Sequence, residues 1–133
     1  MKYVLLDTNA YSNLVRGDTA VRDALGRAET VYMSAVVIGE LLSGFKSGSH
    51  EKRNIAVLTE FLNSPSVRLV GISHDTSEVY AQMMHALRTA GTPIPTNDVW
   101  IASQAVETGA VLVTYNAHFK RIATVRVWDM PSV

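Results

Sequence analysis

The stretch that decides the fold is Met1-Lys-Tyr-Val-Leu-Leu-Asp-Thr-Asn9. Tyr3 to Leu6 is a short apolar run with the length and residue types of a buried strand. An acid, Asp7, follows this run, and an acid at the end of a buried strand lies at the carboxyl edge of a sheet, where open α/β folds bind ligands. Asp7 also suits the N-cap of a following helix, so its position leaves a structural and a chemical role open.

The composition is typical of one globular domain, which we expect to span residues 1–133. Twelve basic and twelve acidic residues give a formal net charge of zero, which argues against a nucleic-acid binder that works by bulk positive charge. The absence of cysteine excludes disulfides and thiol chemistry and fits a reducing cytoplasm. No apolar run approaches the roughly 20 residues of a membrane span, and the first run is too short for a signal peptide.

Strand-like and helical patterns alternate along the chain. Further strands are predicted at Thr30–Met33, Val67–Ile72, Ala110–Thr114 and Val125–Trp128. Helices are predicted over Ala10–Val15, Thr19–Glu29, from Ser34 to about Phe45, Glu51–Asn63, from a cap at Ser73 or Asp75 to about Ala90, Asp98–Glu107 and His118–Ile122. This order predicts an α/β fold with a mostly parallel sheet and helices on both faces.

Glu40 lies inside the apolar helix that follows Ser34. Gly39 and Gly44 are close to it, and a glycine inside a helix costs about 1 kcal/mol relative to alanine. Close approach by another backbone or by a ligand is one reason to tolerate such glycines. A Glu40 side chain that points to solvent explains the pattern equally well, so both interpretations stay open.

Asp98 falls in the first turn of a strongly apolar helix, for which Asn97 is the expected N-cap and Gly109 the expected end. The helix dipole favours a carboxylate there by about 0.3–1 kcal/mol, which alone accounts for an acid. The apolar residues after Asp98 predict that this end of the helix is anchored in the body of the protein.

Thr114-Tyr-Asn-Ala-His-Phe119 follows the fourth predicted strand. Right-handed crossovers place the strand ends at Asp7 and Thr114 on one edge of the sheet. Asn116 is expected to cap the short helix, and His118 is expected at the surface. No histidine pair has the spacing of metal ligands on a helix, so the sequence predicts no zinc site.

Three segments together resemble PIN-domain ribonucleases, and more narrowly the VapC toxins of prokaryotic type II toxin–antitoxin pairs. They are Leu5 to Asn9, Ser34 to Leu41, and the stretch Pro93-Ile-Pro-Thr-Asn-Asp-Val-Trp-Ile-Ala102. The resemblance runs from Met1 to about Met130, and the ordered set is more specific than any of its parts. It implies an α/β/α sandwich with five strands in the order 3-2-1-4-5, which brings the acids into one cleft.

The resemblance also implies a site. Its catalytic residues are Asp7, Glu40, Asp98 and Asn116, of which the three acids bind the metal, and Thr8 and Thr114 support them. Two carboxylates about 4 Å apart repel by about 4 kcal/mol at an effective dielectric constant of about 20, so converging acids need a cation or protons. Oxygen ligands favour Mg²⁺ or Mn²⁺. The implied reaction is metal-dependent endonucleolytic hydrolysis of RNA, which leaves 5′-phosphate and 3′-hydroxyl ends.

Asn116 departs from the family pattern, because many relatives have Asp at this position. An amide keeps an oxygen acceptor but loses a negative charge. We hypothesise that Asn116 weakens a second metal position and leaves the site essentially with one metal. The same residue sustains an alternative function, a catalytically weakened or inactive PIN-like module that binds RNA or a protein.

Lys120 and Arg121 lie close behind Asn116. We hypothesise that both flank the cleft and contact RNA phosphates, although a solvated basic face explains them equally well. The resemblance implies two protein partners, a second copy in a homodimer and an antitoxin whose C-terminal segment lies across the apolar helices.

Two other enzyme and signalling classes fit less well. A receiver domain needs an acid pair at the end of the first strand and a phosphoacceptor Asp after a middle strand, whereas Asp7 stands alone. A dehalogenase-like phosphatase needs an Asp two residues after the first acid, and position 9 is Asn.

Overall fold

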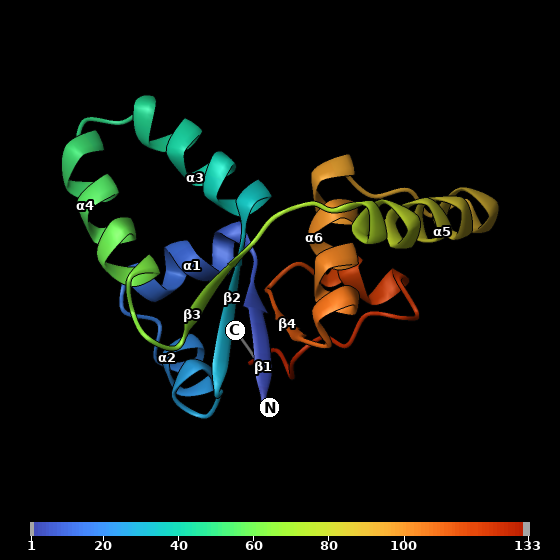
Figure 1. The fold of residues 1–133 in the computed structure, drawn as a ribbon, viewed down its shortest axis with the longest axis horizontal. Coiled ribbons are helices and arrows are strands. Elements are labelled where there is room, and N and C mark those ends of the chain that lie inside the picture. The colour runs from blue at the N-terminus through green and yellow to red at the C-terminus, as the bar shows by residue number, and fades with distance from the viewer. Residues whose placement is uncertain (1, 132–133) are drawn as a thin grey trace.

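The computed structural model describes residues 2–131. Its strands are β1 (Tyr3–Leu6), β2 (Thr30–Ser34), β3 (Val67–Val70) and β4 (Val111–Val113). Its helices are α1 (Thr8–Val15), α2 (Thr19–Gly26), α3 (Ala35–Lys46), α4 (Glu51–Leu62), α5 (His74–Ala90), α6 (Thr96–Thr108) and the 3₁₀ helix η1 (Ala117–Arg121). Figure 1 shows α1 to α4 gathered on one side of the strands and α5 and α6 on the other, with α5 projecting from the body.

The four strands form one parallel sheet in the order β3-β2-β1-β4, which confirms the predicted fold class. The expected fifth strand at Val125–Trp128 is wrong. Among the described residues this segment pairs with β4 only through a single bridge between Val127 and Leu112. The indole of Trp128 turns back to donate a hydrogen bond to the carbonyl of Thr114, and Pro131, which lacks an N–H, follows shortly after. The chain therefore leaves the sheet after one bridge.

Most helix ends match the sequence pattern, and the exceptions have local causes. α1 begins at Thr8, two residues earlier than expected, because Asp7 itself is the N-cap. α2 ends at Gly26 rather than near Glu29. Ser34 caps α3 as predicted, and its hydroxyl oxygen accepts from the N–H of Val36 at 3.0 Å.

The N-cap predicted for α6 is wrong. Pro95 occupies that position, so Asn97 lies inside the first turn. Proline has no side-chain acceptor, so the N-cap makes no side-chain hydrogen bond. The pyrrolidine ring fixes the φ angle of Pro95, and α6 begins directly after it. The consequence for the site is that the Asn97 side chain is free to reach a neighbouring helix.

The core lies on both faces of β1. Val4, Leu5 and Leu6 are completely buried, as are Val99 and Ala102 of α6. Burying one large aliphatic side chain contributes about 1.5–3 kcal/mol to stability. The buried residues of β1 therefore hold the surrounding helices against the strand. None of the helices between residues 2 and 131 has the length and apolar character that a bilayer crossing requires.

A buried amide ties the two site-bearing helices together. The side chain of Gln104, on α6, accepts from the hydroxyl of Ser34 at the start of α3. Its amide nitrogen donates to the carbonyl of Val70, the last residue of β3, at 3.1 Å and to that of Gly71, the next residue, at 3.2 Å. All of its hydrogen-bonding groups are used, so this network fixes α3, α6 and the end of β3 relative to one another.

Candidate active site

The carboxyl edge of the sheet opens into a polar pocket of about 500 Å³. The pocket is lined by the ends of β1 and β4, by the middle of α3 and by the first turn of α6. Its lining residues are Asp7, Thr8, Asn9, Glu40, Pro95, Thr96, Asn97, Asp98 and Asn116. Residues that lie more than 100 positions apart in sequence thus meet in one place, as the sequence pattern predicted for an open parallel sheet.

Asp7 is the N-cap of α1, the structural role that the sequence left open, and it also lines the acidic pocket. Its Oδ1 accepts from the N–H of Ala10 at 2.8 Å and caps α1, while Oδ2 accepts from the hydroxyl of Thr114. Only 4% of the residue is exposed. Burial raises the pKa of Asp7, and the negative charges of Asp98 and Glu40 add to the rise against the two hydrogen bonds. Asp7 is therefore a fixed acid in an electrostatically crowded site.

Glu40 faces the pocket, so the solvent-exposed interpretation of this residue is wrong. The hydroxyl of Thr8 donates to its Oε1 at 2.6 Å, and the amide of Asn97 donates to Oε2 at 3.4 Å. These donors come from α1 and α6, on either side of α3. The carboxylate is thereby held between two other elements of the site.

The glycines beside Glu40 do not mark a close approach within the chain. A Cβ atom placed on Gly39 or Gly44 meets nothing within 4 Å in the described structure. Both glycines line a shallow groove that continues from Glu40 and Asn97 along α3. They leave that side of α3 open next to the acidic pocket.

Asp98 lies in the first turn of α6 and contacts a histidine. Nε2 of His118 is 2.9 Å from its Oδ2, and the two side chains are only 19% and 18% exposed. Burial raises the pKa of Asp98, Glu40 raises it further, and His118 opposes the rise. The predicted surface position of His118 is therefore wrong. No local sequence pattern predicts this contact, because it depends on how η1 packs against α6.

The loop after β4 places Thr114 and Asn116. Thr114 is fully buried, and its Oγ1 accepts from the N–H of Asn116 at 2.9 Å while donating to Asp7. Asn116 holds the N-cap position of η1, but its side chain makes no capping bond and lines the pocket instead. The capping role predicted for Asn116 is wrong, and its amide stays available to whatever enters the pocket.

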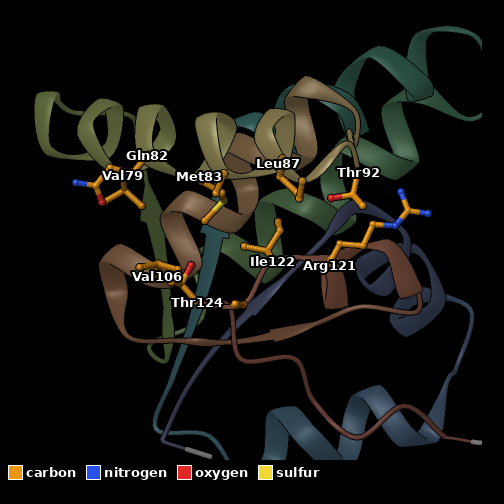
Figure 2. A pocket seen from close by; sticks show the side chains of 12 residues that line it. Val79, Gln82, Met83, Leu87, Thr92, Val106, Arg121, Ile122 and Thr124 are labelled. Atoms are coloured by element: carbon orange, nitrogen blue, oxygen red, sulfur yellow. The ribbon is translucent and has the colours of Figure 1, made fainter.

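The two predicted phosphate-binding residues lie elsewhere. Lys120 is exposed and does not line the acidic pocket. Arg121 donates to the carbonyl of Pro93 at 3.2 Å and borders a separate groove of about 390 Å³ beneath α5. Figure 2 shows this groove, whose walls include the apolar side chains of Met83, Leu87 and Ile122. A role of either basic residue in binding RNA remains a prediction.

The donor chemistry of the pocket fits Mg²⁺ or Mn²⁺. The three acids supply only oxygen ligands, and among residues 2–131 no histidine or cysteine lines the pocket. Oxygen atoms of all three do not lie within 4.8 Å of one another, so the described residues form an open site rather than a closed cage. Mg²⁺ is commonly bound through one or two carboxylates and keeps several waters, which suits this spacing.

A tighter group of possible ligands lies outside the pocket. His74, Asp75 and Glu78 come together in the first turns of α5, and all three are exposed. The ion pair between His74 and Glu78 is a pair of neighbours one helical turn apart. We assign no metal to this surface cluster.

Comparisons with known proteins agree with the fold. The sequence profile of the PIN domain matches residues 4–125. Ribonuclease VapC1 of Haemophilus influenzae (strain R2866) is 32% identical over 108 residues, which cover 76% of this chain and 75% of the relative. Ribonuclease VapC2 of Rickettsia felis is 30% identical over 110 residues, which cover 80% and 81%.

A solved structure gives the same result. The crystal structure of VapBC2 from Rickettsia felis bound to a DNA fragment from their promoter matches with a TM-score of 0.84 and 28% identity, over 97% of this chain and 100% of that chain. VapBC-1 from nontypeable Haemophilus influenzae also matches with a TM-score of 0.84, at 25% identity over 97% of this chain and 98% of that chain. The chain belongs to the PIN-domain family and, within it, to the VapC ribonucleases.

Proposed function

We propose that this protein is a Mg²⁺- or Mn²⁺-dependent endoribonuclease that acts as the toxin of a type II toxin–antitoxin pair. The observation that carries the proposal is the convergence of Asp7, Glu40 and Asp98 in one pocket at the carboxyl edge of the sheet. The names of the curated relatives, which are ribonucleases, support RNA as the substrate.

The three acids would hold the ion, and the surrounding residues keep them in place. Thr114 and the start of α1 fix Asp7, while Thr8 and Asn97 fix Glu40. A bound divalent cation supplies an acidified water and charge stabilisation at the phosphate under attack. Because the carboxylates of Asp7 and Glu40 are already fixed by hydrogen bonds, these two acids need little reorganisation when the substrate arrives.

Asn116 also lines the pocket. Its amide offers one oxygen acceptor and two N–H donors, so it can contact an attacking water or a phosphate oxygen. The pocket brings no positive side chain to its lining among the described residues. RNA would therefore be held near the reacting bond mainly through the cation, with weaker contacts around the rim.

An antitoxin and a second copy of this chain are the proposed protein partners. The solved relatives are VapBC complexes, and one of them holds promoter DNA. RNA as substrate and the absence of cysteine fit a cytoplasmic location. Light scattering of the purified chain tests the homodimer directly, since a monomer at all concentrations would contradict it.

The experiment that tests the activity is cleavage of purified tRNA and of total RNA with Mg²⁺ or Mn²⁺, in parallel with EDTA. Asp7→Asn is the informative variant because Asn also caps helices, so α1 stays intact while a negative charge is lost. Asp75→Asn is the matched control, since Asp75 is exposed and outside the pocket.

We expect cleavage by the wild type and by Asp75→Asn, and none with EDTA or Asp7→Asn. Cleavage that persists in EDTA would contradict the proposal. If no RNA is cut, Asn116→Asp separates two cases. Cleavage by Asn116→Asp would identify a nuclease weakened at this position. No cleavage by this variant, together with metal-independent RNA binding, would favour the binding-module alternative.

A further inference from the structure

His118 does not line the acidic pocket but contacts Asp98, which does. The residue lies in η1, two positions after Asn116, and its ring is 19% exposed. Its edge packs on Phe119, with ring centroids 4.8 Å apart and planes at 61°, and Phe119 is completely buried. The imidazole therefore packs against a residue of the core.

The Nε2 atom of His118 has one neighbour that can accept from it. It is shielded from solvent and lies 2.9 Å from Oδ2 of Asp98, although its N–H does not point straight at that oxygen. This nitrogen makes no hydrogen bond with any other group in the described part of the chain. Of the ion pairs among residues 2–131, this is the one that reaches an acid of the pocket.

Hydrogen bonds fix two of the three acids of the pocket. Asp7 is held by Thr114 and by the N–H of Ala10, and Glu40 is held by Thr8 and Asn97. Within the described residues, no hydroxyl, amide or backbone N–H donates to the side chain of Asp98. His118 is therefore the group available to fix that carboxylate.

We propose that His118 is a positioning residue, which holds Oδ2 of Asp98 and so presents this carboxylate to the divalent cation. This inference rests on the proposed function, because it concerns the same metal site. Side chains that orient a metal ligand from behind typically change metal affinity 10- to 100-fold when they are removed. The lone histidine at the edge of an all-oxygen site acts on a ligand and is not a ligand itself.

The test is calorimetric titration of Mn²⁺ into the full chain, without RNA. We expect His118→Ala to weaken Mn²⁺ binding about 10-fold or more. His118→Gln should bind within about 3-fold of the wild type, because the amide nitrogen of Gln reaches about as far as Nε2 and also donates. His85→Ala, an exposed histidine on α5, is the matched control and should leave the affinity unchanged.

Three comparisons decide the outcome. Wild-type affinity in His118→Ala, or an equal loss in His118→Gln and His118→Ala, overturns the positioning role. If the wild type itself binds no Mn²⁺, the proposed metal site fails, and the inference falls with it. Circular dichroism in EDTA identifies misfolded variants. If His118→Ala is misfolded, the comparison of His118→Gln with the wild type decides the test. Wild-type-like Mn²⁺ affinity of His118→Gln would then support the positioning role, and a 10-fold loss would overturn it.

Discussion

The hydroxyl of Thr114 donates a hydrogen bond to Oδ2 of Asp7, although the two residues lie 107 positions apart in the chain. The bond exists because β4 pairs directly with β1, so both strand ends reach the same edge of the sheet. The same hydroxyl accepts from the N–H of Asn116 at 2.9 Å. One buried threonine thus fixes a carboxylate and the start of the loop that carries Asn116.

Thr114→Val keeps the shape of the side chain and removes both hydrogen bonds. We expect the free energy of unfolding to fall by about 2 kcal/mol, because a carboxylate and a backbone N–H lose their partner in a buried place. Mn²⁺ affinity should fall about 10-fold, since Asp7 loses an orienting donor. Thr114→Ser retains the hydroxyl and should stay close to wild type in urea denaturation and calorimetry. Equal behaviour of the Val and Ser variants would contradict this role.

The raised pKa of Asp7 makes stability depend on pH in the absence of metal. An acid whose pKa is higher in the folded chain binds more protons when folded, so the free energy of unfolding falls as the pH rises from 3.8 through the folded-state pKa. Asp7→Asn removes this loss. In EDTA the variant should therefore gain stability over the wild type as the pH increases from 4 to 7, as measured by urea denaturation.

Asp18 serves as a control because its pKa is shifted in the opposite direction from that of Asp7. The hydrogen bond from the hydroxyl of Tyr115 lowers the pKa of its carboxyl, so its contribution is present above 3.8 and is lost as the pH falls through the lower folded-state pKa. Asp18→Asn should lose stability relative to the wild type as the pH increases through the folded-state pKa of Asp18 up to about 3.8. If both variants changed the slope in the same direction, the electrostatic account of Asp7 would fail.

Local chemistry predicted more of the fold than of the site contacts. The strand run before Asp7, the Ser34 cap and the parallel sheet follow from residues near one another in sequence. The position of Asn97 could not be predicted in this way, because Pro95 and not Asn97 is the N-cap of α6. The contact of His118 with Asp98 could not be predicted either, since it joins η1 to α6 and depends on packing that a sequence pattern does not encode.

The resemblance and the strand order together predicted that the acids would lie in one cleft. The structure adds the hydrogen bonds that hold Asp7 and Glu40. The donors Thr8 and Asn97 come from helices on either side of Glu40. Such pairings are long-range and use common residue types, so nothing in the local sequence singles them out. The missing fifth strand has a similar origin, because a side-chain bond of Trp128 competes with strand pairing.

Gln104 should be a strong determinant of stability. Its replacement by Leu keeps the volume but leaves the buried hydroxyl of Ser34 and two partly buried carbonyls without their partner. We expect the free energy of unfolding to fall by about 3 kcal/mol in urea denaturation. Gln82→Leu, at an exposed position of α5, is the control and should change it by less than about 0.5 kcal/mol. A loss below about 1 kcal/mol for Gln104→Leu would contradict the network.

Tyr115 ties the loop between Thr114 and Asn116 to the start of α2. Its hydroxyl donates to Oδ2 of Asp18 at 2.6 Å, and burial together with this bond raises the pKa of Tyr115 to about 12. Its contribution to stability is therefore complete below pH 10 and is lost between about pH 10 and 12. Tyr115→Phe should remove one phenol that ionises near pH 12 from the ultraviolet titration, and a titration identical to wild type would contradict this assignment.

Asn116→Asp adds a negative charge to a pocket that already holds three acids. Without metal this should lower the free energy of unfolding at pH 7, because like charges in a partly buried site repel. With metal the added carboxylate should tighten Mn²⁺ binding or raise the stoichiometry from one ion to two, as calorimetry would measure. Asn9→Asp is the matched control, since Asn9 lines the same pocket but is exposed. Unchanged affinity and stoichiometry in Asn116→Asp would show that the amide does not limit metal binding, and the one-metal hypothesis for this site would then be abandoned.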